Sequence, residues 1–150
     1  MQVLIVGMSQ ERSAARAKLL EDDGWDVLVA LGFREAVKIL AAQSPDLLIS
    51  EVRLGEFNGL HLVLRCHIAH PAMRTILLDR IYDSVLEFDA QRHGAAYLVE
   101  PVADANLLEQ VSRIGVELTP HRRWPRKRLA VGLLVARPDW RWMARYNGGF

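Results

Sequence analysis

A carboxylate at the end of a short apolar segment is the residue of this sequence best placed to do chemistry. Glu51 follows residues 47–49, which read Leu-Leu-Ile, and a turn signal precedes them at residues 44–46, which read Ser-Pro-Asp. A run this short and apolar is typical of a strand buried on both faces of a parallel sheet. Ligands and catalytic groups gather at the carboxyl ends of such strands. Glu51 is therefore the first candidate for a functional residue.

The segments around Glu51 alternate between strand and helix patterns. Strands are expected at residues 2–6, 25–30, 47–50, 75–78 and 96–99. Helices are expected from the N-cap Ser9 to Gly24, at residues 33–42, 60–68 and 85–93, and from the N-cap Asp104 to about residue 116. In the first helix we expect an apolar face at Ala15, Leu19 and Leu20. This order predicts an α/β fold with a doubly wound, five-stranded parallel sheet and helices on both faces.

The charges divide the chain into two parts. Residues 1–118 carry 11 Lys/Arg against 17 Asp/Glu, whereas residues 119–150 carry eight Lys/Arg against one acid. Three of the four tryptophans also lie in residues 119–150. We expect a folded domain over residues 1–118 and a basic, Trp-rich C-terminal extension over residues 119–150.

Composition also indicates the cellular compartment of the protein and bears on whether it holds a metal or a cofactor. The single Cys66 allows no internal disulfide, and no apolar run is long enough to span a membrane, so a cytoplasmic protein is expected. Cys66 lies among apolar helical residues and is expected in the core. The histidines at positions 61, 67, 70 and 93 share no ligand spacing with cysteines or acids, so neither a metal nor a cofactor is expected.

Four blocks of sequence carry a resemblance to a known family. They are residues 45–50 (PDLLIS), 54–60 (LGEFNGL), 93–95 (HGA) and 97–101 (YLVEP). With these blocks, residues 2–116 resemble the receiver domain of two-component response regulators, a flavodoxin-like fold of the CheY type. The resemblance implies a bacterial signal-transduction protein with a phosphorylation site at the carboxyl ends of its strands.

The positions that carry chemistry in the family hold other residues here. The resemblance implies two acids after the first strand to hold Mg²⁺, but this chain has Gly7 and Met8. The phosphate-accepting Asp corresponds to Glu51, the Ser or Thr after the fourth strand to Asp79, and the Lys before the Pro to Glu100. We therefore predict an atypical, degenerate pseudo-receiver. It would be no enzyme and would act through contacts with a signalling protein partner, independently of phosphorylation.

Three interpretations of the acidic cluster remain open. Glu51, Asp79 and Glu100 could hold a hard cation through their carboxylate oxygens. They could instead pair with Arg53 or Arg80, which would tie the loops together, and we favour this interpretation. Glu51 could also imitate a phosphorylated Asp and hold an active-like state.

Tyr97 corresponds in the resemblance to an aromatic residue that rotates between buried and exposed positions during switching. Its partner position is Asp79 here, so switching is not expected. We expect Tyr97 to pack at a strand edge with its hydroxyl in water. The surface around Tyr97 and the fifth helix is the predicted partner face.

The extension supports several interpretations. Arg122, Arg123 and Arg126 lie beside Trp124, and such a cluster suits phosphate-bearing ligands, including nucleic acid. The Arg122-x-x-x-Arg126 spacing is similar to the RxxxR of PilZ domains, which bind cyclic di-GMP, although the second motif of that family is absent. The alternative function is therefore a cyclic dinucleotide sensor or other phosphate-sensing adaptor. The arginines could equally pair with the acidic domain, and the tryptophans could cover an apolar patch on it or on a second copy in a homodimer.

Overall fold

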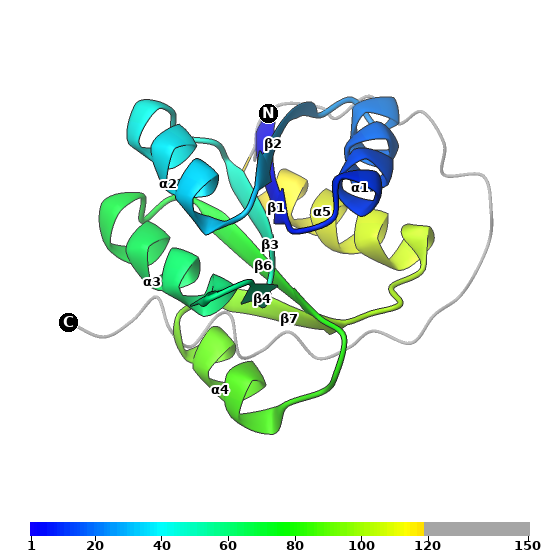
Figure 1. Cartoon of the computed structure of the whole chain (residues 1–150). Helices are drawn as coiled ribbons and strands as arrows, with labels where there is room; N and C mark the ends of the chain where they lie inside the picture. Colours follow the sequence, from blue (N-terminus) through cyan, green and yellow to red (C-terminus); the bar gives the residue numbers. More distant parts are fainter. Residues whose placement is uncertain (119–150) are drawn as a thin grey trace. The chain divides into compact units, whose positions relative to one another are not determined.

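The computed structural model describes residues 1–118, and they form a sheet with helices on both faces (Figure 1). The parallel sheet has the strand order β2-β1-β3-β6-β7. Its strands are β1 (Gln2–Gly7), β2 (Asp26–Leu31), β3 (Leu47–Glu51), β6 (Arg74–Asp79) and β7 (Ala95–Val99). The helices are α1 (Gln10–Asp22), α2 (Phe33–Ala42), α3 (Gly59–Ala69), α4 (Ser84–Arg92) and α5 (Asp104–Leu118). The predicted fold class is confirmed. The predicted extension, residues 119–150, lies outside the described residues.

The two helical layers explain the apolar strands. In Figure 1, α1 and α5 lie on one side of the sheet, while α2, α3 and α4 lie on the other. Every residue of the central strand β3 is buried, as are the last five residues of β1. Strands covered on both faces must be apolar along their length, which is why residues 47–49 carry no polar alternation. Cys66 of α3 is also buried in this core, as expected, and burial raises its thiol pKa to about 11.

Two details of the expected helices are wrong. The buried face of α1 consists of Ser13, Ala17 and Leu20, while Ala15 is exposed. These three residues follow the helical spacing of four and three, which turns Ala15 away from the sheet. Asp104 is the first helical residue of α5 rather than its N-cap. There its charge still complements the positive end of the helix dipole.

The N-cap expected at Ser9 is confirmed. The Ser9 hydroxyl accepts a hydrogen bond from the backbone N–H of Arg12, which fixes the first residues of α1. No helix within residues 1–118 is both long and apolar enough to cross a membrane.

A short hairpin that the sequence patterns did not predict follows β3. Its strands are β4 (Arg53–Leu54) and β5 (Phe57–Asn58), paired antiparallel. Asn58 then caps α3 by accepting a hydrogen bond from the backbone N–H of Leu60. The hairpin returns the chain so tightly that the Gly59 N–H donates to the Val52 carbonyl at 2.7 Å. The end of β3 is therefore held by the start of α3.

Gly59 should tolerate no larger residue. A Cβ at this position would lie 2.2 Å from the carbonyl oxygen of Glu51 and 2.8 Å from the Ser50 hydroxyl. We expect Gly59→Ala to lower the free energy of unfolding by about 1–3 kcal/mol, the usual cost of overpacking, as measured by urea denaturation. Gly94→Ala is the control, because a Cβ there meets nothing within 4 Å and only backbone strain at φ 74° remains. A smaller loss for Gly59→Ala than for Gly94→Ala would contradict this packing.

Candidate functional site

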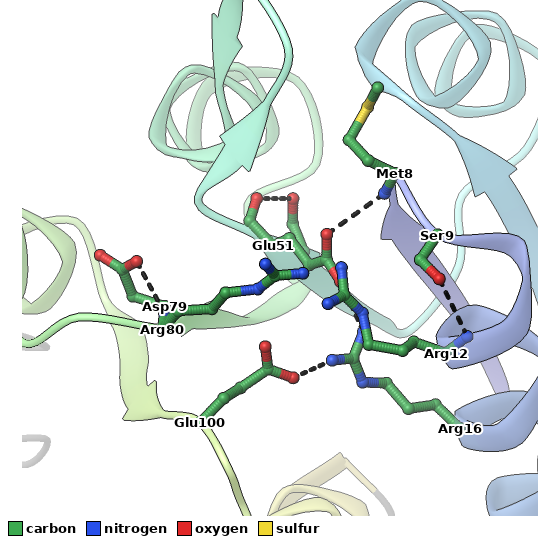
Figure 2. Close-up of polar contacts among 9 residues, drawn as sticks. Met8, Ser9, Arg12, Arg16, Glu51, Asp79, Arg80 and Glu100 are labelled. Carbon is green, nitrogen blue, oxygen red and sulfur yellow. Dashed lines mark hydrogen bonds and ion pairs between the residues drawn. The ribbon is translucent and has the colours of Figure 1, made fainter.

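The carboxyl ends of the strands bring the candidate residues to one cavity. Met8 follows β1, Glu51 and Asp79 end β3 and β6, and Glu100 follows β7. They line a cavity of about 210 Å³ together with Arg12, Arg53, Leu78 and Arg80. Gly7 lies beneath it, where an added Cβ would be 3.2 Å from the Glu51 carboxyl group. The five candidate positions therefore lie at one edge of the sheet. Figure 2 shows all of them except Gly7 around the cavity.

Glu51 is buried and fully paired. Its side chain is 8% exposed, and its Oε1 lies 3.0 Å from Arg16 Nη1 and 3.3 Å from Arg12 Nη2. Its Oε2 accepts a hydrogen bond from the backbone N–H of Met8 at 3.2 Å. Pairing with Arg53 or Arg80 was the favoured interpretation for the acidic cluster as a whole; for Glu51 the pairing cations are Arg12 and Arg16, both from α1.

Arg16 joins two of the acids. Its Nη1 binds Glu51 and its Nη2 binds Glu100 Oε1, while only 12% of its side chain is exposed (Figure 2). We call Arg12, Arg16, Glu51 and Glu100 the arginine–glutamate cluster. It connects α1 to the ends of β3 and β7, across the sheet. A planar guanidinium suits this position because it can donate to two carboxylates at once.

The sequence held a signal for these arginines. Arg12 and Arg16 are four residues apart on a helix that begins just after β1, so they share one face of it. The Ser9 cap sets where that helix starts, and hence which face the two arginines occupy. The four-residue spacing and the cap could have placed two cations beside the strand ends.

Asp79 is bound by different groups. It is 2% exposed, its Oδ1 accepts a hydrogen bond from the Arg80 backbone N–H at 2.8 Å, and its Oδ2 accepts one from the Tyr97 hydroxyl at 3.0 Å. Arg53 Nε lies 3.9 Å from Oδ1, so the expected role of Arg53 as a partner applies to Asp79. Asp79 therefore belongs to a separate network from the arginine–glutamate cluster.

The sequence led us to expect the Tyr97 hydroxyl in water. In the structure it is instead hydrogen-bonded within this second network. Besides its contact with Asp79, it accepts a hydrogen bond from the Asp83 N–H at 3.1 Å and lies 3.3 Å from the Ile81 carbonyl oxygen. Burial, and then the hydrogen bond to Asp79, raise the pKa of Tyr97 to about 12, against a lowering by the Asp83 N–H. Tyr97 thus ties β7 to the loop before α4.

Several large apolar side chains are exposed near Tyr97. Ile81, Tyr82, Val85 and Phe88 are 66, 58, 66 and 62% exposed, on α4 and on the loop before it. The Tyr82 ring packs edge-on against Tyr97, with 6.3 Å between ring centroids. We call these four residues the α4 apolar surface. It adjoins the predicted partner face.

The residues of the cavity do not fit the Mg²⁺ that the receiver resemblance implies. Gly7 and Met8 offer no side-chain oxygen, and Glu51 already has two guanidinium groups against one of its oxygens. A divalent cation would have to displace or repel these cations. Over residues 1–118, no group of three or more His, Cys, Asp or Glu is arranged to hold a metal ion.

The remaining candidates, Arg122, Arg123 and Arg126, lie outside the described residues.

Comparisons with known proteins extend the resemblance. No protein-family model matches the sequence. The alginate biosynthesis transcriptional regulatory protein AlgB of Pseudomonas putida is 36% identical over 89 residues, which cover 59% of this chain and 20% of that protein. AlgB of Pseudomonas aeruginosa is 34% identical over the same length. The chain thus spans about a fifth of the length of these curated relatives.

Solved structures agree in fold. A CheY-like receiver domain protein from Methanospirillum hungatei matches with a TM-score of 0.76 at 22% identity, over 79% of this chain and 96% of that one. A response regulator from Thermotoga maritima matches with a TM-score of 0.68 at 30% identity, over 75% of this chain and 95% of that one. The chain therefore belongs to the response regulators, and its described residues have the fold of their receiver domain.

Proposed function

We propose that this chain is a receiver-like signalling module that works through protein contacts and is not switched by phosphorylation. In this proposal it is no enzyme. The observation that supports it best is the state of Glu51, whose two carboxylate oxygens are already bound by Arg12, Arg16 and the Met8 N–H.

The chemistry of phosphoryl transfer supports the same proposal. An acceptor carboxylate must be free to attack, and cations or a metal must offset the charge on the transferring oxygens. Here Arg12 and Arg16 are bound to Glu51 and Glu100 themselves, so these two guanidinium groups are not free to offset that charge. Glu100 stands where the resemblance implies a Lys, so it adds a negative charge at that point. An incoming phosphoryl group would have to break the arginine–glutamate cluster.

The cluster also bears on the interpretation of Glu51 as a phosphate mimic. Arg16 supplies the cation that a phosphorylated acceptor would attract, and Tyr97 is bound to Asp79. Both contacts exist without any modification, which supports a domain held in one conformation rather than a switch. We infer that a signal changes which partner this domain binds, and does not change the conformation of the domain itself.

The α4 apolar surface favours a protein as partner. Ile81, Val85 and Phe88 place three large apolar side chains in solvent, on α4 and the loop before it, and Tyr82 of the same loop is also exposed. Large exposed apolar side chains gathered on one helix and the loop before it are typical of a site of protein contact. A partner that covers it would remove apolar area from water, at about 25 cal/mol per Å².

The first test is chemical modification. Incubation of the intact chain with acetyl phosphate and Mg²⁺ should leave its denatured mass unchanged, because Glu51 is occupied and Gly7 and Met8 offer no metal ligand. A receiver domain with its full set of acids, treated in parallel, is the positive control.

Glu51→Asp is the matched variant for this experiment. It restores the residue type that the resemblance implies, but it leaves Gly7, Met8 and Glu100 in place. We expect it to stay unmodified as well. A Mg²⁺-dependent gain of one phosphate at Glu51 in the unaltered chain would refute the proposal.

The second test concerns the fixed conformation of Tyr97. Its hydroxyl should titrate near 12 rather than at the ordinary pKa of 10.0, because burial and Asp79 disfavour the phenolate. The folded chain prefers the protonated phenol, so the stability it contributes is complete below pH 10 and is lost as the pH rises towards about 12. The difference in absorbance between the unaltered chain and Tyr97→Phe, measured during titration, isolates this group from the other tyrosines. Titration of Tyr97 at its ordinary value would indicate a ring turned into water.

A further inference from the structure

The parallel sheet has a free edge at β2. This strand comes first in the order β2-β1-β3-β6-β7, so in the described part of the chain it pairs on one side alone, with β1. The Asp26 N–H donates to the Met1 carbonyl oxygen at 3.0 Å, and successive N–H groups of a strand point to opposite edges. The even-numbered residues of β2 therefore face β1. Val27, Val29 and Leu31 present their N–H and carbonyl groups at the free edge.

A side chain protects the last N–H group of this edge. The Leu31 N–H donates to Glu35 Oε2 at 2.7 Å, whereas the Val27 and Val29 N–H groups have no acceptor within the described residues. Natural edge strands are commonly blocked by a charge or a Pro, but residues 27–31 read Val-Leu-Val-Ala-Leu. Val29 and Leu31 are also 37 and 45% exposed. The edge is therefore open to backbone hydrogen bonds and to apolar side chains.

The charges beside β2 indicate what kind of segment fits this edge. Residues 19–33 hold acids at positions 21, 22, 23 and 26, and no Lys or Arg. All of these acids precede Val27, and Asp26 is exposed, so the amino end of the free edge is negative. In a symmetric pair of edges the strands run antiparallel, which brings the acids of each copy towards Glu35 of the other and opposes that pairing. A segment with basic residues meets no such repulsion.

We propose that the free edge of β2 takes up an extended segment of a partner protein as an added strand, with Lys or Arg at the end of the segment that lies beside Asp26. The backbone groups of Val27 and Val29 hydrogen-bond to the segment, and its apolar side chains cover Val29 and Leu31. β2 and β7 are opposite edges of the sheet, so this surface is separate from Tyr97 on β7. It also shares no hydrogen-bonding group with the arginine–glutamate cluster, so it does not rest on the absence of phosphorylation.

The experiment titrates the full chain with the synthetic peptide Lys-Arg-Val-Thr-Val-Thr-Val-Arg-Lys, blocked at both ends, and follows the backbone amides by NMR. We expect saturable shifts at Val27 and Val29. At saturation, hydrogen exchange of both amides should slow about tenfold or more, because each gains an acceptor. This protection distinguishes an added strand from contact with apolar side chains alone. A peptide with Glu in place of every Lys and Arg should bind at least about tenfold more weakly.

Two variants of equal charge make the test specific. Val29→Lys places a charge on the exposed edge, where natural proteins use Lys to block pairing. It should weaken binding of the basic peptide about tenfold or more, while the melting temperature stays the same because the Val29 side chain is exposed. Ile68→Lys is the matched control, because Ile68 is 83% exposed and lies on a helix, α3. It should leave binding unchanged.

Four results would overturn the proposal. The first three are unchanged hydrogen exchange at Val27 and Val29, equal binding of the acidic peptide, and binding that survives Val29→Lys. The fourth is a dimer of the unbound chain, seen by analytical ultracentrifugation, that Val29→Lys abolishes, because a second copy would then occupy the edge.

Discussion

A carboxylate buried at the end of a central strand must be paired, and the pairing of Glu51 determines the rest of this site. Leaving such a group unpaired would cost several kcal/mol. The chain supplies Arg16 and Arg12 from α1, whose first turn is set by the Ser9 cap. Arg16 then also binds Glu100, so one guanidinium links the ends of β3 and β7 to α1. The cavity therefore depends on a contact between elements far apart in sequence.

The same constraint explains how a receiver fold can carry an altered set of charges. The resemblance implies acids after β1 and a Lys after β7, whereas this chain has Gly7 and Met8 in the first place and Glu100 in the second. The cations that bind Glu51 and Glu100 are Arg12 and Arg16, which come from α1. Removing one member of a buried ion pair strongly destabilises a fold, and Arg16 supplies the partner that the half-buried Glu100 needs. The architecture persists while the chemistry of its strand ends differs.

Sequence patterns predicted the fold well because its central strands are buried on both faces and read as unbroken apolar runs, as at residues 47–49. They missed the β4–β5 hairpin, because strands of two residues have no periodicity to detect. They indicated that Glu51, Asp79 and Glu100 lie at one edge of the sheet, because the carboxyl ends of parallel strands meet at the same edge. They did not predict that Arg16 binds Glu51, or that Tyr97 binds Asp79. The spacing of Arg12 and Arg16 could have placed two cations beside the strand ends, but it does not indicate which acid each one binds, because that depends on side-chain reach between elements.

We expect Arg16 and Glu51 to be energetically coupled, and a double-mutant cycle measures this coupling most directly. The four proteins are the unaltered chain, Arg16→Met, Glu51→Gln and the double variant, each unfolded with urea at neutral pH. For a buried pair at 3.0 Å, with side chains 12% and 8% exposed, we predict a coupling energy of about 1–3 kcal/mol. A coupling energy within about 0.3 kcal/mol of zero would show that the two residues act independently. That result would contradict the account of the site as a cavity held by its own ion pairs.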